Sequence, residues 1–259
     1  MSPAISRTLV DFGLEDRIVG RSAFCRSIDP SIPVVGDLHT VNYEQLIRLA
    51  PTHILVQPPS TGLDPKLVEL AAKRAWVLGQ WPRLNGVNDI ERLIRQLPTV
   101  LYSDGSDAHK RAAMRAARLL EEIAAALSPG SEPMFGGGTL LLAGLEPVTV
   151  FGRETYLHDI LMRFGGKNAT DTTGWAQLSL EDVVRISPEA LVLVLADDPD
   201  KAPKPTDALG SFDTLDIPAV RHGRLAVLAH PDSMLPSSGV IGVAHAMRAV
   251  LRQLTQVSE

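Results

Sequence analysis

Residues 44–51, EQLIRLAP, return in a modified form at residues 181–188 as EDVVRISP, and this pair decides the predicted fold. Each copy begins with a helix-capping pattern, at Asn42 in the first and Ser179 in the second. In this pattern, a side-chain oxygen accepts a hydrogen bond from a free backbone N–H at the start of the helix. Each copy ends at a proline, which disfavours helical geometry in the residue before it. Because an apolar stretch follows both prolines, the sequence predicts a short helix and then a buried strand in two places.

A second pair of similar segments lies upstream in each half. LVDFG at residues 9–13 resembles LMRFG at residues 161–165, and each glycine is placed as a helix C-cap. The spacing between the two pairs is longer in the first half, which indicates an insertion around residues 21–33, where Cys25 lies. Two collinear matches predict two related lobes.

The two halves differ at their beginnings. In the second half, a predicted strand at residues 147–151 precedes the helix at residues 156–164. In the first half, the matching helix begins within a few residues of Met1, and no such strand precedes it. We therefore expect the first strand of the N-terminal lobe to be missing from this sequence and to be encoded upstream of Met1.

An alanine-rich segment connects the halves. Residues 106–127 carry apolar side chains at helical spacing and end at SPG, so they predict one helix of about 33 Å. The expected fold is α/β, with two Rossmann-like lobes joined by one long rigid helix and a ligand cleft between the lobes. The predicted parts are an N-terminal lobe (1–105), a connecting helix (106–128) and a C-terminal lobe (129–259).

Composition excludes several classes of function. The chain has 259 residues and a formal net charge of −5, with Lys and Arg scattered, so nucleic acid is not an expected partner. Its apolar runs are far shorter than the ~20 residues that a membrane-spanning helix needs. The single cysteine, Cys25, excludes an internal disulfide and a multi-thiolate metal cluster, and residues 1–6 lack the features of a secretory signal.

Loose motifs run along nearly the whole chain: LEDRIVG (14–20), PVVG (33–36), LAPTHILV (49–56), FGGKN (164–168), LSLED (178–182) and PAVRHGR (218–224). Their order and spacing resemble the periplasmic substrate-binding proteins for vitamin B12, heme and iron siderophores, and the vitamin B12 branch is the most similar. The resemblance implies a monomeric receptor that delivers a metal chelate to the permease of an inner-membrane ABC importer. It implies no catalytic residues, no metal and no cofactor of its own, and a periplasmic or cell-envelope location; a natural start at Met1 would instead imply a cytoplasmic one.

Ligands of doubly wound sheets bind outside the carboxyl ends of the strands, so the loops after the predicted strands are the candidate site. These loops are residues 36–41, 57–61, 79–82, 152–156, 172–177, 196–198 and 230–231. The candidate ligand-binding residues in them are Leu38, His39, Trp81, Tyr156, Trp175 and His230. The repeat makes Leu38 the counterpart of Trp175.

Aromatic and imidazole side chains suit a large, flat, amphipathic ligand such as a corrinoid or a porphyrin. A catecholate siderophore would need clustered arginines, and only Arg153 is expected near the mouth of the site. Structural interpretations stay open: Trp81 or Trp175 could fill the core, Tyr156 could pack on the neighbouring helical turn, and His39 and His230 are less often axial metal ligands than hydrogen-bonded structural residues.

The resemblance also implies one acidic permease-docking residue on each lobe, at Asp64 and Asp213. Asp64 followed by Pro65 is equally typical of a helix N-cap. Asp213 could be no more than a solvated loop charge.

An enzyme is the main alternative class, because α/β folds host many reactions. The sequence contains no Gly-x-Ser-x-Gly elbow, no phosphate-binding Gly-x-x-x-x-Gly-Lys loop and no His-Glu-x-x-His pair. A tetrapyrrole metal chelatase would need a histidine and a carboxylate acting together, but His158 and Asp159 are adjacent in a predicted helix and face different sides. A cytoplasmic protein that handles corrinoids or tetrapyrroles on the same fold is the other alternative.

Overall fold

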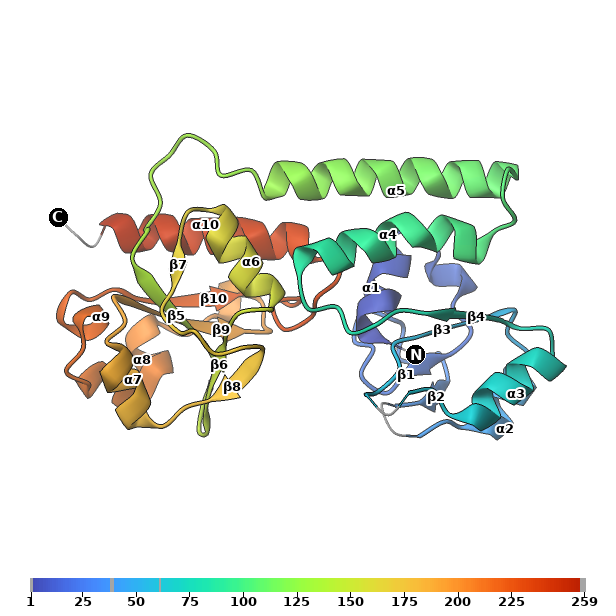
Figure 1. The fold of residues 1–259 in the computed structure, drawn as a ribbon, viewed down its shortest axis with the longest axis horizontal. Helices are drawn as coiled ribbons and strands as arrows, with labels where there is room; N and C mark the ends of the chain where they lie inside the picture. The colour runs from blue at the N-terminus through green and yellow to red at the C-terminus, as the bar shows by residue number, and fades with distance from the viewer. Residues whose placement is uncertain (1, 38–39, 61, 257–259) are drawn as a thin grey trace. The chain divides into compact units, whose positions relative to one another are not determined.

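The computed structural model describes residues 2–37, 40–60 and 62–256, and they form two units (Figure 1). The first unit holds the described residues up to Leu84 together with Asn88–Glu121, and the second holds Asn85–Val87 and the described residues from Glu122 onward. Helix α5, Asp107–Ala126, lies within the range predicted for the connecting helix. Most of α5 belongs to the first unit, and the division into lobe, helix and lobe stays a prediction.

The first unit carries two pairs of parallel strands. β1 (Arg21–Ser22) pairs with β2 (Val34–Gly36), and β3 (His53–Val56) pairs with β4 (Val77–Gln80). In the described part of this unit, no strand joins the two pairs into one sheet. Its helices are α1 (Pro3–Asp11), η1 (Glu15–Arg17), α2 (Tyr43–Leu49) and α3 (Pro65–Lys73). It also contains most of α4 (Val87–Leu101) and most of α5.

The second unit is built on one mixed sheet with the order β10-β9-β5-β6-β8, and β7 also pairs with β5. The strands are β5 (Gly138–Leu145), β6 (Val148–Phe151), β7 (Lys167–Asn168), β8 (Trp175–Gln177), β9 (Ala190–Leu195) and β10 (Leu225–Ala229). The helices are α6 (Tyr156–Arg163), α7 (Leu180–Ile186), η2 (Pro199–Lys201), α8 (Pro205–Leu209), η3 (Gly210–Thr214), α9 (Pro218–Arg221) and α10 (Val240–Gln256). The central strands are parallel, as in a Rossmann-like fold, whereas β6 and β8 run antiparallel to their neighbours.

The structure confirms the repeated helix and strand. Asn42 Oδ1 and Ser179 Oγ each accept the backbone N–H three residues later, at 2.9 and 3.1 Å, and cap α2 and α7. Both helices end in a left-handed residue before the proline, Ala50 with φ 44° and Ser187 with φ 54°. Strands β3 and β9 then follow, so the same local sequence pattern produces the same helix, turn and strand in both units.

The second pair of segments also forms matching structures. Gly13 and Gly165 follow α1 and α6 with φ of +65° and +78°, a backbone region that favours glycine. The expectation about the first strand needs a correction in one respect. The sequence indicated residues 147–151 as the equivalent of that strand, and Val148–Phe151 of this range form β6. However, the strand that pairs with β9 is β5, whereas β6 pairs with β5 and β8. The counterpart of the position beside β3 is therefore β5.

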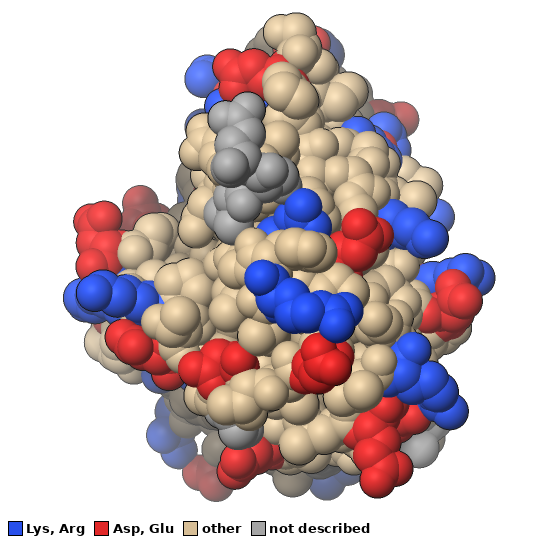
Figure 2. All heavy atoms as spheres, turned by 90° about the vertical axis from the view of Figure 1, so that its left-hand side faces the viewer, with Lys and Arg blue, Asp and Glu red and all other residues tan. Residues whose placement is uncertain are grey.

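Each unit has its own apolar core. In the first unit, it comprises Val35, Leu46, Ile54, Val56 and Leu67. In the second, it lies against the sheet and comprises Leu140, Leu142, Val148, Val150, Val183, Leu191, Leu193, Leu209, Phe212, Ile217 and Ala219. No helix among the described residues is long and apolar enough to span a membrane. Figure 2 shows Lys and Arg interspersed with Asp and Glu on one face of the molecule, in line with the scattered charges of the sequence.

Candidate functional site

Four loops of the second unit are linked by hydrogen bonds among them or to the adjoining residues Leu195 and Tyr156, and we call them the loop cluster: residues 152–155, 172–174, 196–198 and 230–233. Gly152 N donates to Gly174 O at 2.8 Å, which joins the first two loops. The last two follow the paired strands β9 and β10, and the carbonyl of Leu195, the final residue of β9, accepts from His230 N at 3.1 Å and from Ser233 Oγ at 2.7 Å. Tyr156 joins the two halves of the cluster. The predicted loops of this unit are thus brought together.

Trp175 is the exposed aromatic residue beside the loop cluster. The sequence predicted a loop here, but Trp175 begins strand β8, and 56% of its surface is exposed. Its ring meets the buried ring of Phe151 edge to face, at 4.6 Å between centroids and 64° between planes. The buried partner fixes one side of the indole and leaves an apolar surface open to solvent, which suits contact with a flat ligand.

Tyr156 is buried and has a structural role in this unit. Its hydroxyl donates to the carbonyls of Asp232 and Ser233, and 3% of the residue is exposed. Burial, and then the charge of Asp232, raise the pKa of the phenol well above its ordinary value, so the hydroxyl stays protonated and keeps donating. Tyr156 therefore fixes the turn at residues 230–233, and its role as a ligand contact stays a prediction.

His230 packs closely against helix α10. Its Nδ1 accepts from Asp232 N at 3.1 Å, and a Cβ atom at Gly242 would lie 2.2 Å from Nε2. The imidazole thus orients its own turn and requires a glycine in the facing helix. This geometry favours the structural interpretation of His230 over axial ligation of a metal. Direct contact with a ligand stays a prediction.

Trp81 lies in the core of the first unit. It is 2% exposed, and its Nε1 donates to Gln96 Oε1 at 2.8 Å. These contacts favour the interpretation that Trp81 fills the core, and its role as a ligand contact stays untested. Leu38 and His39 lie outside the described residues.

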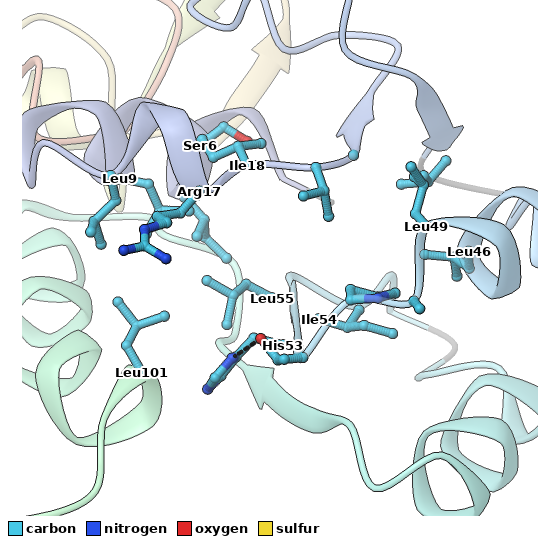
Figure 3. A pocket seen from close by; sticks show the side chains of 18 of the residues that line it. Ser6, Leu9, Arg17, Ile18, Leu46, Leu49, His53, Ile54, Leu55 and Leu101 are labelled. Carbon is cyan, nitrogen blue, oxygen red and sulfur yellow. Dashed lines mark hydrogen bonds between the residues drawn. The ribbon is translucent and has the colours of Figure 1, made fainter.

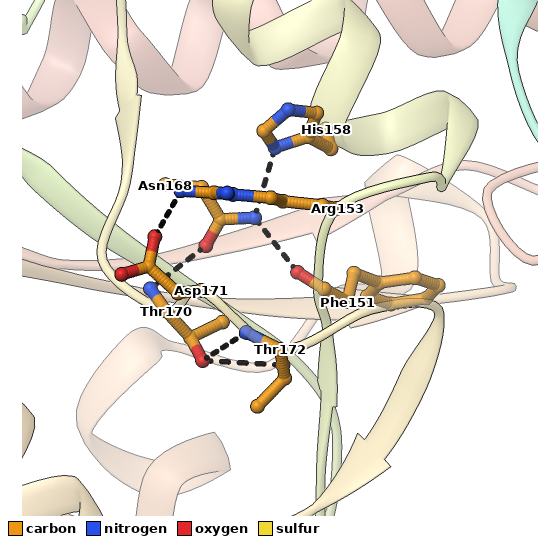
Figure 4. Close-up of polar contacts among 7 residues, drawn as sticks. All are labelled: Phe151, Arg153, His158, Asn168, Thr170, Asp171 and Thr172. Atoms are coloured by element: carbon orange, nitrogen blue, oxygen red, sulfur yellow. Dashed lines mark hydrogen bonds and ion pairs between the residues drawn. The ribbon is translucent and has the colours of Figure 1, made fainter.

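A polar network surrounds the first loop of the cluster (Figure 4). Arg153 forms an ion pair with Asp171, and both side chains are mostly exposed. Asn168 Nδ2 donates to Phe151 O at 2.9 Å and lies 3.3 Å from His158 Nδ1. Sequence reasoning assigned no role in the site to Asn168 or Asp171, because no local pattern indicates that they contact residues 151–158.

His158 and Asp159 have separate partners. Whereas His158 contacts Asn168, Asp159 Oδ2 accepts from Val87 N at 2.9 Å. The two side chains therefore do not act as one chelatase pair. Among the described residues, no group of three or more His, Cys, Asp or Glu side chains is placed to hold a metal ion.

The two predicted docking carboxylates, Asp64 and Asp213, are exposed on their own units. Asp64 caps α3 through Oδ1, which accepts from Lys66 N at 2.9 Å, and Oδ2 accepts from the Tyr43 hydroxyl. The bond from Tyr43, followed by the one from Lys66 N, lowers the pKa of Asp64. Burial, and then the bond to Asp64, raise the pKa of Tyr43 to about 12. Asp64 is thus a helix cap that keeps an accessible charge, so both interpretations of it are compatible.

Sequence and fold comparisons agree with each other. A profile of the family described as "Periplasmic binding protein" matches residues 1–231. No curated protein matches the chain. The periplasmic heme-binding protein RhuT from Roseiflexus sp. RS-1 is similar in fold, with a TM-score of 0.72, 18% identity, and coverage of 100% of this chain and 97% of that one.

Two further solved structures show the same fold. The periplasmic vitamin B12-binding protein BtuF of Vibrio cholerae has a TM-score of 0.70 and 15% identity, with 99% of this chain and 96% of that chain covered. A possible iron-binding periplasmic solute-binding protein from Staphylococcus epidermidis has a TM-score of 0.70 and 17% identity, with 96% and 95% covered. The two-unit α/β fold of this chain is therefore shared along nearly its whole length.

Proposed function

Because this chain belongs to the periplasmic binding protein family, we propose that it is the substrate-binding protein of an ABC importer for a metal chelate. The family match over residues 1–231 is the observation that carries this proposal, and full-length likeness to heme- and vitamin B12-binding proteins supports it. The family consists of binding proteins, so an enzymatic role is not proposed. The ligand that we propose first is a cobalamin-like corrinoid, and heme and a ferric siderophore are the other members of the class.

The exposed indole of Trp175 supports a flat, amphipathic ligand. An aromatic face held by a buried neighbour offers a large contact area at little cost in conformational entropy. The loop cluster beside it supplies backbone and side-chain polar groups that can fix the ligand's orientation. The expectation that both units contact the ligand stays a prediction.

The charge near the loop cluster argues for a neutral or weakly charged ligand over a catecholate siderophore. Arg153, which lies in the loop cluster, is already paired with Asp171. A strongly anionic ligand would have to compete with this carboxylate for the guanidinium. Siderophores are therefore the last of the three classes that we propose.

We propose a periplasmic or cell-envelope location, with Asp64 and Asp213 as contacts to the permease. Their exposure leaves both carboxylates accessible to a partner. Charge reversal at Asp213 should weaken delivery to the permease and leave ligand affinity unchanged. An unaltered rate of uptake in Asp213→Lys would contradict this assignment.

The ligand class can be tested with the purified chain, cyanocobalamin, heme and ferric enterobactin. We expect one chelate to change its visible spectrum on binding and to raise the melting temperature of the protein. The gain in stability follows RT ln(1 + [L]/Kd), or roughly 2.7 kcal/mol at a hundredfold excess over Kd. A melting temperature unchanged by all three chelates would contradict the proposed function.

Trp175→Ala tests the site itself. We expect it to weaken binding of the selected chelate about five- to thirtyfold, because an aromatic contact of this kind contributes roughly 1–2 kcal/mol. Met162→Ala is the matched control, because Met162 is similarly exposed, at 49% against 56%, but lies on α6 outside the loop cluster. Equal affinities for the two variants would remove Trp175 from the site.

A further inference from the structure

One ion pair neutralises the basic side chain of the loop cluster. Arg153 is the sole Lys or Arg of the cluster, and its guanidinium donates to the carboxylate of Asp171, which directly precedes the second loop. Figure 4 shows the Arg153 side chain extending past Asn168 to reach Asp171. The acidic residues of the cluster are Glu154, Asp197, Asp198 and Asp232. While the ion pair is intact, the cluster therefore carries an excess of negative charge.

The backbone of the loops holds the two partners of this pair in place, although they are 18 residues apart in the sequence. Arg153 N donates to Thr172 O at 2.7 Å, which joins the two loops directly beside Asp171. On the other side of Asp171, Thr170 N donates to Oδ1 of the buried Asn168 at 3.2 Å. The fold of both loops thus brings the carboxylate and the guanidinium together.

The ion pair is close to the aromatic contact proposed above and is open to a ligand. Trp175 pairs with Phe151, two residues before Arg153. The side chains of Arg153 and Asp171 are 57% and 86% exposed. Because water solvates both charges, an exposed pair of this kind contributes little to stability and is easily exchanged. An anionic group of a ligand at Trp175 would therefore compete with Asp171 for the guanidinium, whereas a neutral or cationic ligand would leave the pair intact.

We propose that Asp171 determines the charge selectivity of this site: by occupying the Arg153 guanidinium, it favours neutral or cationic chelates over anionic ones. The acidic residues of the loop cluster act in the same direction, because like charges disfavour an anionic ligand. This inference rests on the proposed function and adds to it a residue that selects the class of ligand.

The affinities of Asp171→Asn for three chelates of different charge test this role in the full chain. Cyanocobalamin has no net charge, heme carries propionates, and ferric enterobactin is more strongly anionic. Compared with the control below, we expect Asp171→Asn to bind heme about threefold and ferric enterobactin about tenfold more tightly, because Arg153 becomes available to the ligand. Cyanocobalamin should gain less than either anionic chelate.

Asp216→Asn is the matched control. Asp216 is paired with Arg221 outside the loop cluster, and these side chains are 85% and 58% exposed, nearly as in the pair of Asp171 with Arg153. Both substitutions remove one negative charge from the chain, so the comparison cancels the effect of net charge. The double variant Arg153→Gln, Asp171→Asn should lose most of the gain, because it lacks the guanidinium that Asp171 occupies.

Ionic strength gives a readout that a purely structural role of Asp171 would not change. At about 1 M salt, where the Debye length is about 3 Å, the gain for the anionic chelates should fall below about twofold. Equal affinities of the two single variants for both anionic chelates, a full gain in the double variant or a gain that persists at high salt would overturn the inference alone. Failure of the unaltered chain and of every variant to bind any of the three chelates would overturn the proposed function as well.

Discussion

The two units use the same helix and strand but support them differently. In the second unit, β9 is paired on both sides, with β10 and with β5. In the described part of the first unit, β3 is paired with β4 alone, and residues 53–55 of β3 line a cavity of about 450 Å³ (Figure 3). Local sequence therefore forms the helix and the strand, whereas the neighbouring strands determine how strongly the strand is stabilised.

Two corresponding core residues should give the largest effects. Leu191→Ala in β9 should lower the free energy of unfolding of the second unit by about 4 kcal/mol, because Leu191 is fully buried in a packed sheet. Ile54→Ala in β3 should cost the first unit about 2 kcal/mol, because Ile54 already borders a cavity. Denaturant unfolding followed by amide exchange measures each unit separately. A greater loss in Ile54→Ala than in Leu191→Ala would contradict the difference between the two units.

Gly152→Ala tests the close packing of the loop cluster, which has no described equivalent in the first unit. A Cβ atom at this position would lie 2.1 Å from the carbonyl oxygen of Thr172, so the backbone must shift. We expect a loss of about 3 kcal/mol in the second unit, measured by thermal unfolding. Gly136→Ala is the control, since its Cβ would be 3.5 Å from the nearest atom and should change stability little.

The matched left-handed residues should respond alike. Ala50→Gly and Ser187→Gly should each stabilise their own unit by about 0.5–1 kcal/mol, because glycine adopts a positive φ without the steric cost of a Cβ atom. Ala117→Gly, inside α5, should have the opposite sign and cost about 1 kcal/mol. Opposite signs at residues 50 and 187 in a melting experiment would mean that the two turns are not equivalent.

The smallest expected effect is a pH dependence of the first unit through His53, whose counterpart in the repeat is Ala190. Burial lowers the pKa of His53 below 6.5, although a hydrogen bond to the Val100 carbonyl partly offsets it. Below pH 6.5, the unfolded chain therefore binds a proton before the folded chain does, and the stability of the first unit falls as the pH drops towards the folded pKa.

Comparison with His53→Ala isolates this effect from the other titrating groups. The substitution gives β3 the residue type of β9 and should remove the difference in stability across this pH range. Titration of the His53 ring by NMR measures the pKa directly. A pKa above 6.5, or an unchanged pH dependence in His53→Ala, would contradict the assignment.

Sequence reasoning predicted the elements formed by local contacts. The caps at Asn42 and Ser179 and the glycines after α1 and α6 depend on residues within one helical turn, so their patterns are visible in the sequence. Contacts between distant residues were not predictable in this way. The ring of His230 against Gly242 and the pairing of Arg153 with Asp171 arise only when the sheet has brought their loops together.

Burial was the other quantity that sequence could not supply. Trp81 and Trp175 were predicted on similar grounds, as aromatic residues after strands, yet one is 2% and the other 56% exposed. The difference follows from their partners: Gln96 accepts a hydrogen bond from the indole N–H of Trp81 inside the core, whereas Trp175 packs on Phe151 from the edge strand of the sheet. Neither partner lies within one helical turn in the sequence.

Amide exchange of the full chain, with and without the chelate selected by the binding assay, tests the proposed function and its site most directly. We expect slower exchange at residues 152–155, 172–175 and 230–233 when the chelate is bound, with α9 unchanged. Protection confined to α9 and its neighbours, with none in the loop cluster, would contradict it.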